Sequence, residues 1–100
     1  METIKTNVLF MVSISNLDDT SGYDNVFDSI SEYEEYIAEQ SQVILNGVFS
    51  YDKARFVVRE FCLTDEQFKK VEGWTATAFI DNFYEFWENS KEIENFVVGY

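Results

Sequence analysis

The acidic residues of this sequence are the ones whose type and spacing could support binding or catalysis. Two series of acidic residues are spaced alternately by three and four positions. Their members are Glu32, Glu35 and Glu39 in the first series, and Asp81, Glu85, Glu88 and Glu92 in the second. Residues at these spacings share one face of an α-helix, so each series predicts a row of charges that rises by about 5 Å per carboxylate. Such a row could bind cationic groups, and a pair within it could act as an acid and a base.

Composition and burial argue against a catalytic role. The sequence contains no His, the side chain that most often serves as a general base near neutral pH. An i, i+4 pair such as Asp81 and Glu85 on an exposed helix face lacks the burial that separates two carboxylate pKa values in a glycosidase-like site. One hundred residues also leave little room for a substrate cleft. We expect that the protein is not an enzyme.

Metal and cofactor sites are not expected either. Cys62 is the only cysteine, which excludes an intramolecular disulfide and a Cys-based zinc site, and we interpret it as a small buried hydrophobic residue. An acidic loop at 16–24 could hold calcium. Its carboxylates, Asp18, Asp19 and Asp24, lack the alternate-residue spacing and the terminal Glu of an EF-hand loop. The prediction is therefore no metal and no cofactor.

The charge is strongly acidic and unevenly distributed. Nineteen acidic and 7 basic residues give a formal net charge of -12. No basic residue lies between Lys5 and Lys53, whereas nine acidic residues do. Nucleic acid and anionic membranes require Lys and Arg facing phosphate, so this charge disfavours direct binding to either. We expect a basic protein as the partner, and a homodimer is left open.

The N-terminal segment does not read as a targeting sequence. Its apolar stretch is broken by Ser13 and Ser15 and has no signal-peptide cleavage pattern. No apolar run approaches the roughly 18 to 20 residues that cross a bilayer. We therefore expect a cytoplasmic protein.

The hydrophobic pattern predicts an α+β fold in a single globular domain over residues 1–100. A 46% hydrophobic and 18% aromatic composition supports a folded core. We expect a small antiparallel sheet of about three strands packed with three to four amphipathic helices. The expected strands are 4–14, 54–63 and the tail from Phe96, with a helix as the alternative for 54–63. In the first strand, Leu9 and Met11 on the second face indicate an inner strand covered on both sides.

Three helices are expected from capping and periodicity. A capping box at Ser31 and Glu34 predicts a helix to Asn46, with Asn46-Gly47 as either its cap, which we favour, or a hairpin turn between 43–45 and 48–51. A second capping box, at 64–67, predicts a short helix over 65–72 closed by Gly73. After it, a stripe of apolar residues predicts a third helix that buries Phe83. The stripe comprises Ala76, Phe79, Ile80, Phe83 and Trp87.

The overall character resembles small acidic proteins of phages and mobile elements that block host defence, namely antirestriction DNA mimics and anti-CRISPR inhibitors. The resemblance rests on the charge of -12 at 100 residues, the absence of His and Pro, and acidic aromatic segments such as SEYEEYIAEQ and FIDNFYEFWENS. It implies a protein, in a bacterial host cell, that fills the nucleic-acid-binding surface of a nuclease or defence complex and blocks DNA by competitive occlusion.

The expected partner-binding residues are acidic side chains and two tyrosines. They are Asp24, Asp28, Glu32, Glu35, Glu39, Asp81, Glu85, Glu88, Glu92, Tyr36 and Tyr84. Two alternatives stay open. One is an immunity or antitoxin protein that neutralises a basic nuclease toxin, since barstar-like proteins are similar in size and sign of charge. The other is a structural subunit of a larger assembly, with the aromatic residues at its interface.

Overall fold

The inner strand β1 carries apolar side chains on both faces and contributes to the hydrophobic core on each side of the sheet. The computed structural model describes residues 3–17, 22–46 and 53–99. Its elements follow in the order β1 (Val8–Asn16), β2 (Gly22–Phe27), α1 (Ile30–Leu45), β3 (Lys53–Cys62), α2 (Asp65–Val71), α3 (Ala76–Asp81), the 3₁₀ helix η1 (Phe83–Asn89) and β4 (Ser90–Gly99). The predicted α+β class is confirmed.

The four strands of the described residues form one antiparallel sheet in the order β2-β1-β3-β4. The sheet has one strand more than expected. β3 confirms the strand interpretation of 54–63, and β4 confirms the strand at the tail but begins earlier, at Ser90. The extra strand is β2, whose first residues fall within the predicted loop at 16–24. Gly22–Phe27 lacks an alternating apolar pattern because β2 is an edge strand with exposed side chains at its start.

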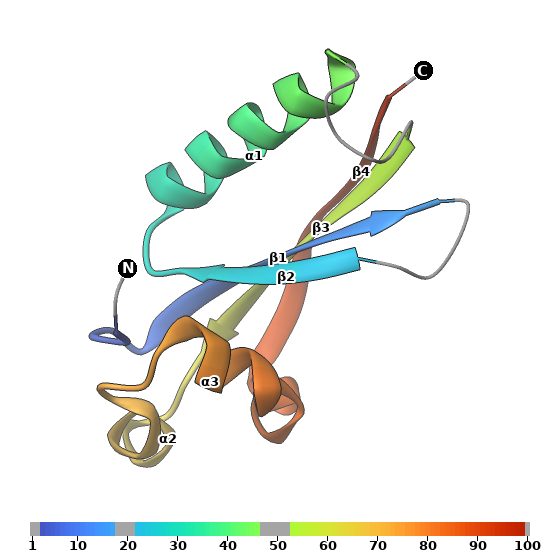
Figure 1. Cartoon of the computed structure of the whole chain (residues 1–100). Coiled ribbons are helices and arrows are strands. Elements are labelled where there is room, and N and C mark those ends of the chain that lie inside the picture. The colour runs from blue at the N-terminus through green and yellow to red at the C-terminus, as the bar shows by residue number, and fades with distance from the viewer. Residues whose placement is uncertain (1–2, 18–21, 47–52, 100) are drawn as a thin grey trace.

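Each face of the sheet has its own hydrophobic core. On one face, Phe10, Val12 and Ile14 pack with side chains of β3 beneath α1, which contributes Tyr33 and Ile44. The opposite face buries Leu9 and Met11 of β1, as expected for an inner strand. Residues from the 63–86 region cover it, among them Leu63, Val71, Phe79 and Phe86. Figure 1 shows α1 lying along one side of the sheet and α2 and α3 grouped on the other, at one end.

The first strand is shorter at its start than the alternation predicts. β1 begins at Val8, and Ile4 instead joins the turn after α2. The Ile4 amide donates to the Trp74 carbonyl at 2.8 Å, and the Ile4 carbonyl accepts from the Gly73 amide at 2.9 Å. Ile4 is fully buried there. Ile4 is therefore apolar because it is buried in the core, although it does not belong to β1.

Capping sets the helix boundaries. The side chain of Ser29 accepts a hydrogen bond from the Glu32 amide at 3.2 Å, so α1 begins at Ile30 and the predicted capping box at Ser31 and Glu34 is wrong. At the other end, 43–45 is helical, which rules out the hairpin alternative, while Gly47 and 48–51 lie outside the described residues. The predicted capping box of α2 is confirmed, with both reciprocal hydrogen bonds between Thr64 and Gln67.

Candidate partner-binding surface

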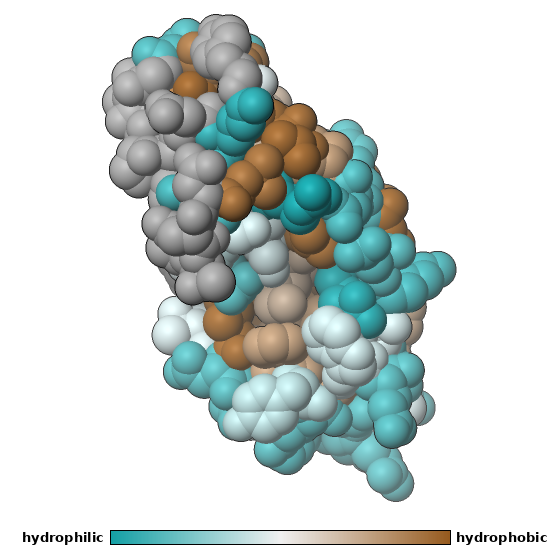
Figure 2. Space-filling model, turned by 90° about the vertical axis from the view of Figure 1, so that its right-hand side faces the viewer, coloured by the Kyte–Doolittle hydropathy of each residue, from teal (hydrophilic) through white to brown (hydrophobic). Residues whose placement is uncertain are grey.

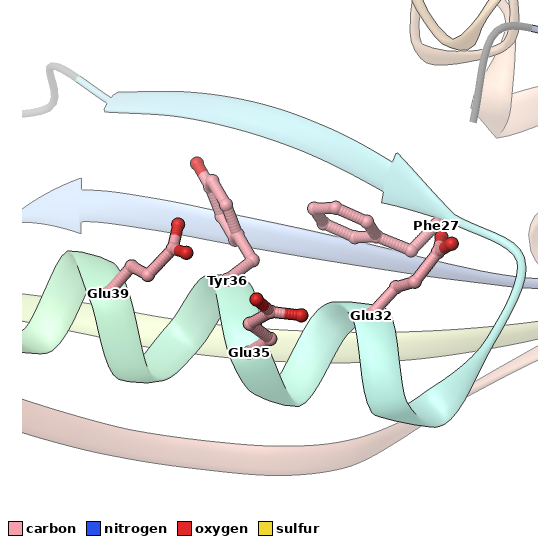
Figure 3. Close-up of a pocket in the computed structure, with 5 residues that line it drawn as sticks. All are labelled: Phe27, Glu32, Glu35, Tyr36 and Glu39. Atoms are coloured by element: carbon pink, nitrogen blue, oxygen red, sulfur yellow. The ribbon is translucent and has the colours of Figure 1, made fainter.

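The first predicted carboxylate row is present on α1. We call Glu32, Glu35 and Glu39 the α1 row; all three are exposed. Together with Tyr36 and Phe27 they line a shallow hollow of about 230 Å³ between α1 and the end of β2. Figure 3 shows the three carboxylates along one side of the helix and Tyr36 reaching toward β2. The helical repeat alone accounts for this alignment.

Aromatic contacts fix α1 over the sheet. The Phe27 and Tyr36 ring centroids lie 5.0 Å apart. Burial raises the pKa of Tyr36, and hydrogen bonding with Tyr23 and Asn25 partly offsets that rise. On the buried side of the helix, the ring of Tyr33 packs against the ring of Phe10, with 5.0 Å between the two centroids. These contacts hold the row on a rigid element.

Tyr33 also connects α1 to β4. The carboxylate of Glu94, a residue that faces α1 from the sheet edge, lies near the Tyr33 hydroxyl. Burial, and then the hydrogen bond and charge of Glu94, raise the pKa of Tyr33 to about 12. The phenol therefore stays neutral over the physiological range.

The acidic side chains around the α1 row are not neutralised. Residues 22–46 contain six acidic and no basic residues. Within the described ranges, no Lys or Arg nitrogen lies within 4.0 Å of any of these six carboxylates, whereas two acids elsewhere are paired: Glu85 with Lys70 at 2.8 Å and Glu60 with Lys91 at 3.6 Å. Five of these six carboxylates lie on α1 or in the turn before it, so carboxylates without a neighbouring cation gather on the α1 side.

The second predicted row does not exist as a helical row. α3 ends at Asp81, because Asn82 leaves the helical conformation and its side chain donates to the Ala78 carbonyl at 2.9 Å. Glu85 and Glu88 follow in the 3₁₀ helix η1, and Glu92 lies in β4. A 3₁₀ helix has three residues per turn, so spacings of four and three no longer align. Glu85 is also neutralised by Lys70.

The break also changes which aromatic side chains are buried. Phe86 is buried, although the predicted stripe omitted it, and Trp87 of that stripe is 45% exposed. The sequence predicts Phe83 to be a core residue. It packs against the core but is only half-buried, so the predicted full burial is wrong. Tyr84, a predicted binding residue, is 66% exposed.

The remaining predicted acids are not members of the α1 row. Asp28 is half-buried in the turn between β2 and α1. Asp24 lies on the face of β2 away from α1, where it accepts a hydrogen bond from the Ser13 hydroxyl. In the acidic loop at 16–24, for which no metal is predicted, Asp24 lies among the described residues, and Asp18 and Asp19 fall outside them. No three metal-ligating side chains gather in the described ranges.

A second hollow, which the sequence did not indicate, lies on the face of the sheet opposite α1. We call it the open-face cavity. It measures about 380 Å³ and is lined by Met11, Ser13, Asp24, Val57, Arg59, Phe83, Trp87 and Glu92. Seen from this side, hydrophobic surface is exposed in the middle of the face, with hydrophilic side chains around it (Figure 2). Strand pairing brings six of these residues together across the sheet, and η1 adds Phe83 and Trp87, which is why no local motif could have identified the cavity.

Arg59 is held away from the acid opposite it. In the register of β3 and β4, Arg59 is paired with Glu92. Its guanidinium nevertheless lies 3.6 Å from the centroid of the Trp87 ring, and its Nε donates to the Ser90 hydroxyl at 2.8 Å. The cation–π contact and this hydrogen bond fix the side chain as one wall of the open-face cavity.

Cys62 is exposed, so its interpretation as a buried hydrophobic residue is wrong. It is the last residue of β3 and points to the face opposite the buried Phe61. Its thiol donates to a Glu60 carboxylate oxygen at 3.4 Å. Partial desolvation and then Glu60 raise the pKa of this thiol, which disfavours the reactive thiolate.

None of the helices in the described part of the chain is long and apolar enough to cross a membrane. No protein family, curated protein or solved structure matches this sequence or fold.

Proposed function

We propose that this protein is an acidic inhibitor that occupies the positively charged nucleic-acid-binding surface of a nuclease or defence complex and blocks DNA by competitive occlusion. The observation that carries the proposal is the α1 row: three exposed carboxylates on one rigid helix, in a segment of six acidic and no basic residues.

Spacing supports an electrostatic likeness to a nucleic acid. Along the helix axis, Glu35 lies about 4.5 Å from Glu32 and about 6 Å from Glu39. Phosphates of one DNA strand recur about every 3.4 Å along the duplex axis. The row is coarser, so it fits a surface where Arg and Lys contact only some phosphates, as is usual for proteins that bind DNA.

Rigidity supports the proposal as well. α1 is capped by Ser29 and held to the sheet by the buried side chains of Tyr33 and Ile44. Because the row does not need to be ordered on binding, little conformational entropy is lost when the partner docks. A net charge of -12 would also speed the encounter with a basic partner, in a salt-dependent way.

A capture experiment with two matched variants tests the proposal. The tagged protein is incubated with bacterial lysate at low salt and eluted first with duplex DNA and then with high salt, and the eluted proteins are identified by mass spectrometry. One variant, Glu35→Gln with Glu39→Gln, removes two charges of the row. The control, Glu66→Gln with Glu72→Gln, removes two exposed charges of the α2 region and gives the same net charge.

The expected result is a basic nucleic-acid-binding protein that DNA displaces, that the control variant retains, and that the row variant loses. Equal capture by both variants would show that the total charge, and not the α1 row, determines binding. A partner that neither DNA nor salt releases would point to an apolar interface and overturn the proposal.

A further inference from the structure

We infer that the open-face cavity receives a Lys or Arg side chain of the same basic partner, with Asp24 as its charge partner. This inference rests on the proposed function and adds a second contact to it, on the opposite face of the sheet from the α1 row.

The shape and floor fit the stem of a long side chain. The cavity measures about 380 Å³, within the range of pockets that take small ligands. Met11, Val57 and Phe83 give it apolar surface. Lys and Arg side chains bury their methylene stems on such surface and keep the charged end in a polar environment. Trp87, 45% exposed, lies at the cavity as an aromatic side chain of the kind enriched in binding hot spots.

The charges leave one carboxylate uncompensated. Three charged side chains line the cavity: Asp24, Arg59 and Glu92. Arg59 and Glu92 come from paired positions on β3 and β4, but the guanidinium lies on the Trp87 ring and forms no ion pair with Glu92, so the lining carries two carboxylates and one guanidinium. Asp24 comes from β2, at the other side of the sheet, and no Lys or Arg nitrogen of the described residues lies within 4.0 Å of it. The cavity therefore has a net charge of one carboxylate and complements a cation.

Asp24 is also oriented in advance. Ser13, its direct neighbour on β1, donates its hydroxyl to a carboxylate oxygen of Asp24. Val57 occupies the next position of the same row, on β3. A cation that approaches over Val57 thus meets a carboxylate whose geometry is already fixed, which favours a charge-assisted hydrogen bond.

An NMR titration of the full ¹⁵N-labelled chain tests this inference. The probe is a capped hexa-arginine peptide, and the control probe is the isosteric, neutral hexa-citrulline peptide. The indole N–H of Trp87, identified with the variant Trp87→Phe, reports on the cavity. The backbone amides of Glu35 and Glu39 report independently on the α1 row.

We expect hexa-arginine to shift both sets of signals and hexa-citrulline to shift neither. Asp24→Asn should weaken the binding reported by Trp87 about tenfold, which corresponds to about 1.4 kcal/mol, and leave the α1 signals unchanged. Asp65→Asn, an exposed carboxylate of α2 with the same change in charge, should have no effect at Trp87.

The outcomes separate the two proposals. If the α1 amides shift and the Trp87 indole does not, or if Asp24→Asn binds like the parent protein, the cavity inference is wrong and the proposed function stands. A shift of Trp87 by hexa-citrulline would also overturn it, since charge would not be the cause. If neither set of signals moves with hexa-arginine, the proposed function fails as well.

Discussion

Replacing Glu35 by Gln should stabilise the protein although it removes a side chain from the proposed binding row. Glu35 is exposed on α1, with Glu32 three residues before it and Glu39 four residues after it. Like charges at such spacings destabilise a helix by about 0.2 to 0.5 kcal/mol per pair. The substitution relieves two such pairs and should raise the free energy of unfolding by about 0.4 to 1 kcal/mol.

Thermal unfolding followed by circular dichroism measures this gain. For a domain of this size the Tm should rise by about 2 to 8 °C at low salt. The gain should shrink at high salt, because salt screens repulsion between exposed charges. Glu72→Gln is the matched control, since Glu72 follows α2 and has no acidic neighbour at the corresponding spacings.

Two results would refute this reasoning. One is an unchanged or lower Tm of Glu35→Gln at low salt, which would mean that the row carries no repulsive strain. The other is a gain that high salt leaves intact, which would point to packing or helix propensity as its source. In either case the α1 row would not be the concentrated charge that the proposed function requires.

Three further predictions concern the core, the alkaline limit and the thiol. Phe79→Ala should destabilise the fold by about 3 to 5 kcal/mol in urea unfolding, because Phe79 is fully buried, and the half-buried Phe83→Ala should cost clearly less; equal losses would contradict the assigned core. Stability should fall as the pH rises from 10 to 12, because the unfolded chain releases the Tyr33 proton at about 10.0 while the folded protein keeps it to about 12. Tyr33→Phe should reduce this fall, and an identical alkaline profile would exclude Tyr33 as its cause. Cys62 should react with Ellman's reagent without unfolding but more slowly than a free thiol at the same pH, and Glu60→Gln should accelerate the reaction; no acceleration would show that Glu60 does not hold the pKa up.

Features that depend on neighbouring residues could be predicted from the sequence. The α1 row follows from the helical repeat, and the capping box of α2 follows from Thr64 and Gln67 three residues apart. The two-sided burial of β1 follows from the alternation of its side chains, with Leu9 and Met11 on the second face. In each case the deciding interaction spans one turn of helix or one strand.

Features that depend on competition between local and distant interactions could not be predicted from the sequence. The pattern after Ala76 fits one long helix, yet Asn82 ends α3 and the following residues form η1. There the rings of Phe79 and Phe86 stack at 5.4 Å in the core of the second face, an arrangement that a continuous helical stripe did not indicate. Packing against the sheet outweighs the helical periodicity of this segment.

By itself, then, the sequence determined the charge, the α+β class and the α1 row, because composition and local periodicity are properties of short segments. Only the tertiary structure decided that Asp24 and Glu92 line one cavity and that Arg59 stacks on Trp87. Asp24, Arg59 and Glu92 meet through the register of β2, β1, β3 and β4, and Trp87 reaches Arg59 from η1, which packs on the sheet. Register is fixed by the burial of two whole sheet faces at once, and no single segment of the sequence contains that information.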